Sequence, residues 1–188
     1  IKTSVLNPQP WCAPPGIGGG DIYSSSVIKY RHKYHMYFGG WYESCRYLDS
    51  IYISDYDPIL GMATNVRRVI SPEDSNMAGI NDPSVITLSS AFTHKYLSMY
   101  MTGGRGSQGV VFISTSWADD GINWSSPIFL LPDKWVIGAA LNQQNNHVYV
   151  WANDFVTGAV SLFDMDTTGV NVLSEMPITW TTPNAYYF

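Results

Sequence analysis

The segments VIKYRHKYHMYFGG (27–40) and VITLSSAFTHKYLSMYMTGG (85–104) decide the fold, because they are two copies of one pattern. Both open on Val-Ile, continue through His-Lys-Tyr and Met-Tyr, and close on Gly-Gly. Their matching histidines, His32 and His94, lie 62 residues apart. A shared pattern at a fixed spacing indicates an internal repeat.

Further matches extend the repeat along the chain. SIYIS (50–54) matches VVFIS (110–114) at a spacing of 60 residues. A third, more degenerate copy has HVYVWAND (147–154) where the Met-Tyr strand should be, and AVSLFDMDTTGVN (159–171) follows it. The period shortens to about 50 residues in this copy, so the sequence predicts three related units.

Each unit contains four short segments of alternating apolar and polar residues, separated by turn residues. In the middle unit these segments are 84–88, 96–101, 109–115 and 128–131. Four antiparallel strands that recur every 50 to 60 residues or so are typical of a β-propeller blade. A β-sandwich of hairpins is the alternative, but it does not explain the regular long-range period.

The composition agrees with an all-β protein. Charged residues make up only 13% and aromatic residues 14%, and aromatic side chains suit a pleated sheet. The net charge of −5 offers no basic stripe for a phosphate backbone, so nucleic acid is not an expected partner. No apolar run approaches the ~20 residues of a membrane span, and no motif predicts a cofactor or a metal.

The predicted organisation is a Pro/Gly-rich segment over 1–20, followed by blades over about 21–75, 76–133 and 134–188. Closed propellers have roughly four to eight blades. We therefore expect this chain to be part of a larger ring that missing sequence, other copies or other chains complete.

Cys12 and Cys45 permit a single pairing. Low charge and many aromatic residues favour an extracellular setting, in which a disulfide could join the N-terminal segment to the first unit. Two unrelated thiols are an equally good interpretation, because spacing alone does not show that the cysteines meet.

The middle unit also resembles a known family. NDPSVI (81–86), KYLSMYMTGG (95–104) and VVFISTSWADDGINW (110–124) are similar to the blade pattern of the five-bladed glycoside hydrolases, the group of family 43 arabinanases and xylosidases and family 32 invertases. The resemblance covers about residues 21–180 and is strongest in this unit. It implies a five-bladed propeller in which three carboxylates from different blades meet at the central axis.

In that family, the Asp of an Asp-Pro pair at the start of an innermost strand is the general base or nucleophile, and Asp82 matches it. The corresponding position in the first unit is Ser24, with Asp21 displaced. The third unit, WVIGAAL (135–141), has no acid there. One of the three expected carboxylates is thus present in its motif.

Strand direction predicts which loops share a face, independently of the family. The start of each first strand and the loop between the second and third strands must lie together, on what we call face A. Carboxylates, amides, an arginine and aromatic rings are what a sugar site needs. The face A candidates are Asp21, Trp41, Tyr42, Glu43, Asn81, Asp82, Arg105, Asn153 and Asp154.

Other prominent residues are expected to be structural. The DDGINW turn (119–124) falls on the opposite face B, so we interpret Asp120, Gly121 and Trp124 as turn residues, with Gly121 at positive φ. His32 and His94 are expected to be surface or structural residues instead of a metal pair. The second-strand tyrosines are predicted to pack between blades; they are Tyr37, Tyr100 and Tyr149.

Two functions remain open at this stage. The first is a glycan-binding or structural propeller of a secreted, cell-surface or virion assembly, without turnover. The second is a fragment of a glycoside hydrolase that acts on a polysaccharide, with Asp82 as base or nucleophile and Glu43 as a weaker candidate. Hydrolysis generally needs two carboxylates roughly 5 to 10 Å apart. The carboxylate count therefore favours the binding function, and we do not expect this chain alone to be an enzyme.

Overall fold

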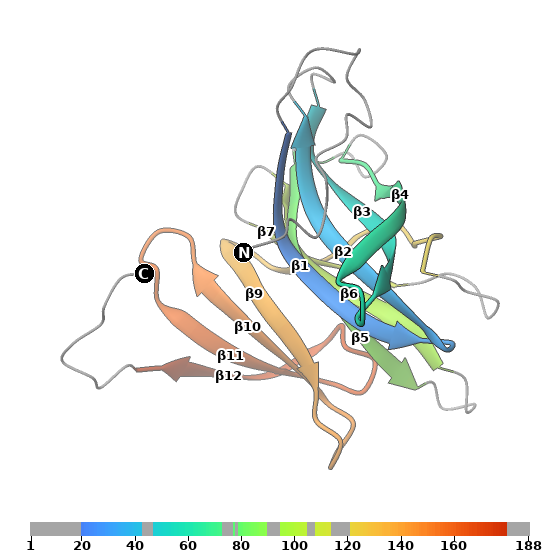
Figure 1. Cartoon of the computed structure of the whole chain (residues 1–188). Coiled ribbons are helices and arrows are strands. Elements are labelled where there is room, and N and C mark those ends of the chain that lie inside the picture. Colours follow the sequence, from blue (N-terminus) through green and yellow to red (C-terminus); the bar gives the residue numbers. More distant parts are fainter. Residues whose placement is uncertain are drawn as a thin grey trace.

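The computed structural model describes residues 20–42, 47–72, 77, 79–89, 95–104, 108–113 and 121–179. These residues form three antiparallel sheets of four strands each, and they include no helix. Each sheet consists of consecutive strands in their sequence order, as Figure 1 shows. The predicted all-β class is therefore confirmed. Within the described ranges, no helix is long and apolar enough to cross a membrane.

The strands have the following bounds. The first sheet contains β1 (Gly20–Tyr30), β2 (Lys33–Tyr42), β3 (Tyr47–Asp57) and β4 (Met62–Ile70). The second contains β5 (Gly79–Ser89), β6 (Lys95–Gly104), β7 (Gln108–Ile113) and β8 (Ile128–Leu131). The third contains β9 (Lys134–Leu141), β10 (Val148–Asp154), β11 (Val160–Met165) and β12 (Val172–Ile178).

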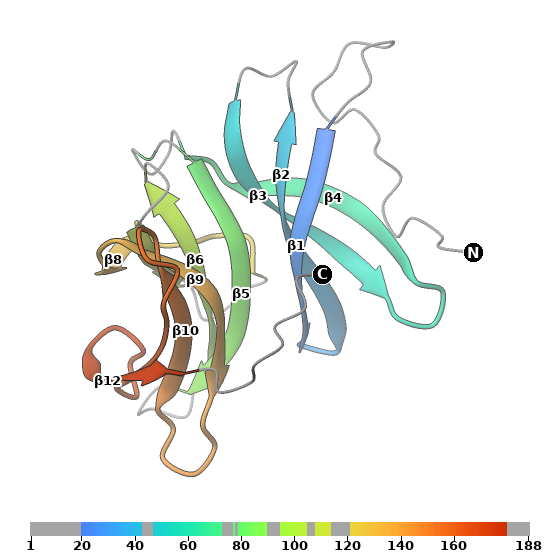
Figure 2. The ribbon, with the colours of Figure 1, turned by 90° about the vertical axis from the view of Figure 1, so that its left-hand side faces the viewer.

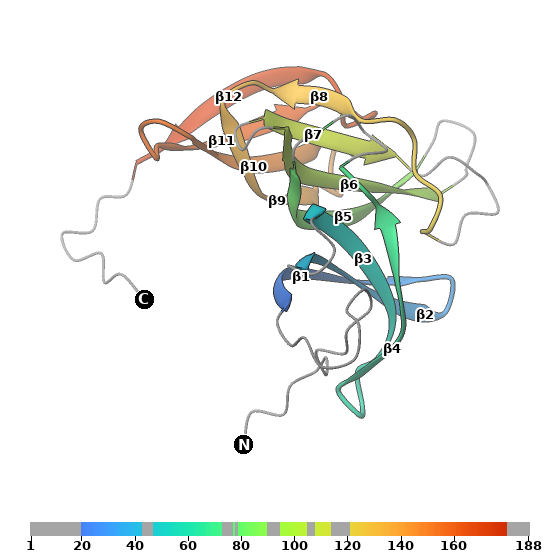
Figure 3. The same ribbon diagram turned by 90° about the horizontal axis from the view of Figure 1, so that it is seen from above.

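The second sheet lies between the other two and is buried on both faces (Figure 3). Side chains alternate between the faces of a strand, and β6 shows the consequence. Leu97, Met99 and Met101 pack toward the first sheet, whereas Tyr100 packs toward the third. All four side chains are fully buried. Two apolar layers, one on each face of the second sheet, therefore hold the three sheets in one row.

A tyrosine hydroxyl joins each pair of neighbouring sheets. Tyr37 on β2 donates to the carbonyl of Gly121 at 3.2 Å, and Tyr100 on β6 donates to the carbonyl of Gly169 at 2.9 Å. Both glycines have positive φ, 77° and 74°, in the turn between the third and fourth strands of the next sheet. Trp124 reinforces the first of these contacts, because its Nε1 donates to the same Gly121 carbonyl at 2.9 Å. The structural interpretation of Gly121 and Trp124 is confirmed.

Tyr149 of β10 is not the equivalent of Tyr37 and Tyr100, because the equivalent position is one residue further along the chain. Tyr37 lies opposite Ser26 and Tyr100 opposite Ser84, but the corresponding residue of β10 is Val150, opposite Ala139. A shift of one residue turns a side chain to the other side of a sheet. Tyr149 is accordingly only half-buried, and its hydroxyl accepts a hydrogen bond from Asn142. Tyr149 does not pack between the sheets as predicted, whereas Tyr37 and Tyr100 do.

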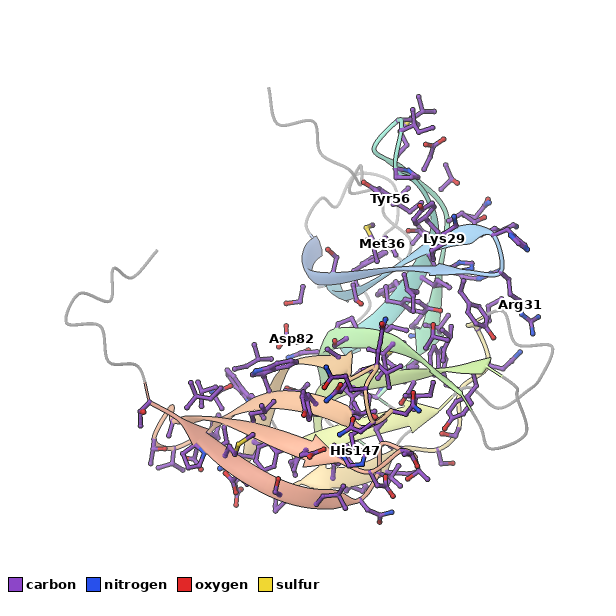
Figure 4. All side chains as sticks on the ribbon, turned by 90° about the horizontal axis from the view of Figure 1, so that it is seen from below. Lys29, Arg31, Met36, Tyr56, Asp82 and His147 are labelled. Atoms are coloured by element: carbon purple, nitrogen blue, oxygen red, sulfur yellow. The ribbon has the colours of Figure 1, made fainter. Side chains whose placement is uncertain are left out.

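The strand registers agree with the two predicted faces. Asp21 lies opposite Trp41, and Lys134 lies opposite Asp154, so the first-strand starts and second-strand ends are neighbours. In Figure 4, Asp82 and Arg31 are labelled at opposite ends of the strands. Arg31 belongs to the turn between β1 and β2, together with the exposed His32. His32 is thus a surface residue, as predicted, while His94 lies outside the described residues.

Candidate functional site

The first strand of each sheet, β1, β5 or β9, carries one irregularity near its start. β1 has one extra, unpaired residue between Tyr23 and Ser25. β9 has one extra residue opposite the bond between Trp151 and Ala152 of β10. In β5 the irregularity falls between Asn81 and Ser84. Such bulges redirect a side chain, and they are common beside functional sites.

The bulge residues are Ser24, Asp82 and Ile137, one from each sheet. Ser24 and Asp82 both have positive φ, 44° and 55°, a conformation that residues other than glycine adopt at a cost. Asp82 was predicted to begin the innermost strand at about residue 84. The strand in fact begins at Gly79, so Asp82 lies inside β5, at the bulge.

The three bulges line one pocket. It has a volume of about 480 Å³, and Figure 2 shows that β5 lies between β1 and β9. Polar side chains, one indole ring and three smaller apolar side chains form its wall. The lining residues are Ser24, Ser25, Ser26, Asp82, Pro83, Ser84, Trp135, Val136, Ile137 and Asn153.

Side-chain hydroxyls fix the strands that form this pocket. Ser26 Oγ of β1 accepts the backbone N–H of Val85 at 3.0 Å. Ser84 Oγ of β5 accepts the backbone N–H of Ala139 at 2.8 Å. Each of these bonds joins strands of two different sheets. The backbone N–H that donates is one that the hydrogen-bond ladder of its own sheet leaves unpaired. The pocket wall is therefore held by hydrogen bonds as well as by the apolar layers.

Asp82 is the one carboxylate among the described residues that line the pocket. It is half-buried, and the serine hydroxyls and the Asn153 amide provide further donors and acceptors. At the equivalent bulge positions, the first sheet has a hydroxyl in Ser24 and the third has the apolar Ile137. This arrangement is suited to binding hydroxyl groups. Among the described lining residues, Asp82 has no second carboxylate beside it to form the pair that glycoside hydrolysis generally uses.

The other predicted site residues are described in part or lie outside the described residues. Asp21, Trp41 and Tyr42 are described in their backbones only, on paired strands at the same end of the first sheet. Asn81 adjoins Asp82 and lies opposite Thr102. The predictions for Glu43, Arg105, Cys12 and Cys45 fall outside the described residues. Among the described residues, no cluster of three or more His, Cys, Asp or Glu side chains could hold a metal ion.

Asp154 has a local structural role in the turn after β10. Its Oδ1 accepts the backbone N–H groups of Val156 at 3.0 Å and Thr157 at 2.8 Å, and its Oδ2 pairs with Lys134 Nζ at 3.1 Å. The hydrogen bonds from Thr157, followed by that from Lys134, lower the pKa of Asp154 well below its usual value. Both oxygens are thus engaged, and a ligand-binding role for Asp154 stays a prediction.

Sequence reasoning missed the aromatic part of the pocket. Trp135 lines it from the start of β9, with 41% of its surface exposed. Phe155 lies beside it, with 5.4 Å between the ring centroids. The signal was present, because the rule that places first-strand starts on face A applies to Trp135 as it does to Asp82.

Comparisons with known proteins support a distant fold relationship. Neither a family model nor a curated protein matches the sequence. The structure is similar to that of an exo-beta-1,3-galactanase from Clostridium thermocellum, with a TM-score of 0.58 and 16% sequence identity. The match covers 80% of this chain and 36% of the galactanase chain. The chain therefore has a glycoside hydrolase-like fold, as the resemblance implied, and it spans about a third of that enzyme's length.

Proposed function

We propose that this chain is a glycan-binding β-propeller module whose pocket holds a saccharide without cleaving it. The observation that carries the proposal is the set of residues at the three bulges. A hydroxyl, a carboxylate and an aliphatic side chain, from Ser24, Asp82 and Ile137, surround a pocket of about 480 Å³. Hydroxyls and one carboxylate bind sugar hydroxyl groups, whereas turnover generally needs a second carboxylate.

The propeller itself is part of the proposal. Three sheets in one row, each joined to the next by a tyrosine-to-glycine hydrogen bond, are what three neighbouring blades of a propeller would form. The fold likeness to a much longer enzyme supports further blades. We propose that additional sequence, other copies or other chains complete a five-bladed ring in an extracellular, cell-surface or virion assembly.

The first ligand to test is a β-1,3-linked galactan, because the similar structure is that of an exo-beta-1,3-galactanase. Binding of β-1,3-galactobiose is measured by calorimetry for the wild type and for Asp82→Asn. Loss of the carboxylate removes charge-assisted hydrogen bonds, so the Asn variant should bind about tenfold more weakly or worse. Ser174→Ala, an exposed change on β12 outside the pocket wall, is the control and should leave the affinity unchanged.

The second candidate function is a glycoside hydrolase fragment with Asp82 as base or nucleophile. It is supported by the fold likeness and by the part of the galactanase that this chain does not span. In that case the complete protein releases reducing sugar from a panel of polysaccharides, and Asp82→Asn abolishes the release. An intact assembly that binds glycans but releases no sugar rules out the hydrolase.

A further inference from the structure

Trp135 combines exposure with a fixed position in the pocket. It lies opposite Asn153 across the β9–β10 pair, and both residues line the pocket with Asp82. An indole with 41% of its surface exposed inside a concave site leaves a large flat apolar area available. The next residue, Val136, is buried, and its N–H donates to Thr102 Oγ1 at 2.9 Å. The backbone beneath the indole is therefore anchored to the second sheet.

Phe155 extends this aromatic surface beyond the pocket. Its ring is 52% exposed and is tilted by 54° against the Trp135 ring. Its backbone N–H donates to the Asp133 carbonyl at 3.0 Å. The ion pair between Lys134 and Asp154 joins the residues that precede the two aromatics. Both rings are thus carried on a cross-linked pair of strand ends, which reduces the entropy lost when a ligand binds.

The charges around the platform favour an uncharged ligand. Asp82 supplies a negative charge to the pocket wall, and the described lining residues include no cation. Lys134, adjacent to the platform, is already paired with Asp154 at 3.1 Å. An acidic sugar would meet the Asp82 carboxylate without a compensating charge from this wall, which costs binding energy.

From this geometry we infer that Trp135 and Phe155 form a two-part aromatic platform for a neutral oligosaccharide. Trp135 stacks on the apolar face of the pyranose ring that sits in the pocket, and Phe155 stacks on the next ring of the chain. The inference rests on the proposed glycan-binding function. It assigns the ligand class, uncharged hexopyranosides of two or more units, and the two residues that select it.

The test compares galactose, β-1,3-galactobiose and digalacturonic acid as probes, with affinities from NMR titration and ligand contacts from saturation transfer. Trp135→Ala should weaken galactobiose binding about tenfold or more, and Trp135→Phe should retain part of it. Phe155→Ala should reduce the affinity for galactobiose to that for galactose, while leaving galactose binding unchanged. Digalacturonic acid should bind more weakly than galactobiose. Phe129→Ala, which removes an exposed ring of β8 outside the pocket, is the control and should have no effect.

The outcomes separate this inference from the proposed function. If Asp82→Asn abolishes galactobiose binding while Trp135→Ala and Phe155→Ala bind normally, the glycan site stands and the aromatic platform is wrong. Equal or tighter binding of digalacturonic acid also overturns the assigned ligand class. If no neutral saccharide binds the wild type, both the function and the platform are wrong. Urea denaturation of each variant confirms that a loss of binding does not come from unfolding.

Discussion

Replacing Gly169 with alanine puts a methyl group where the Tyr100 hydroxyl lies. A Cβ built on Gly169 overlaps that hydroxyl oxygen and comes within 3.3 Å of a Val148 methyl carbon. The Tyr100 side chain is fully buried, so it has no room to move aside. The positive φ of 74° adds about 1 kcal/mol for any residue with a Cβ. We expect a total loss of about 3 kcal/mol or more.

Gly158→Ala is the matched control. Gly158 has nearly the same φ, 71°, but a Cβ built there meets nothing within 4 Å. It should cost only the backbone part, about 1 kcal/mol. The difference between the two alanine variants therefore measures the contact with Tyr100.

Tyr100→Phe tests the same contact from the other side. It removes the hydrogen bond to the Gly169 carbonyl and should cost about 1 to 3 kcal/mol. In the double variant the oxygen that blocks the new methyl group is gone, so Gly169→Ala should cost less than in the wild type, by about 1 kcal/mol or more. Free energies of unfolding from urea titrations give the coupling. Additive effects, or equal costs at Gly158 and Gly169, refute the tyrosine contact as the element that joins neighbouring sheets.

Three further predictions concern the same packing and its pH dependence. Burial raises the pKa of Tyr100 above its usual 10.0, so stability should be full below pH 10 and fall above it; Tyr100→Phe should flatten this alkaline loss in urea titrations. Partial burial raises the pKa of Asp166, but hydrogen bonds from Asn171 and Thr168 outweigh it and lower the value from 3.8 to about 2. The stabilisation by ionised Asp166 should therefore be present above pH 3.8 and be lost as the pH falls through 2, and Asp166→Asn should remove this dependence; an unchanged acid titration contradicts it. Ser84→Ala leaves the Ala139 N–H without its 2.8 Å partner and should destabilise the protein by about 1 to 3 kcal/mol, whereas Ser174→Ala, at an exposed position of β12, should be neutral.

The repeat and the strand directions were sufficient to predict much of the fold. Two copies with His-Lys-Tyr, Met-Tyr and Gly-Gly at one spacing gave the strands of the first two sheets, and the direction rule put Asp82 at the right end of its sheet. The alignment failed in the third copy, where Tyr149 and Val150 differ by one position. Apolar side chains occupy both positions of a short alternating strand there, so the pattern alone did not fix which side faces the neighbouring sheet.

The candidate site was predictable in its location but not in its detail. The bulges at Ser24 and Asp82 depend on pairing with other strands, and the contacts of Ser26 and Ser84 reach residues 59 and 55 positions away. Such contacts leave no local signal in the sequence. Trp135 was predictable, because it lies near the start of the first strand of its sheet, as Asp82 does.

The measurement that tests the central claim most directly is a calorimetric titration of β-1,3-galactobiose into the wild type and Asp82→Asn. The claim is that the pocket between β1, β5 and β9 binds a saccharide through the carboxylate at the β5 bulge. It predicts saturable binding by the wild type and a loss of about tenfold or more in the Asn variant, with unchanged urea stability. Equal affinity of the two proteins, or no heat of binding with either, would contradict it.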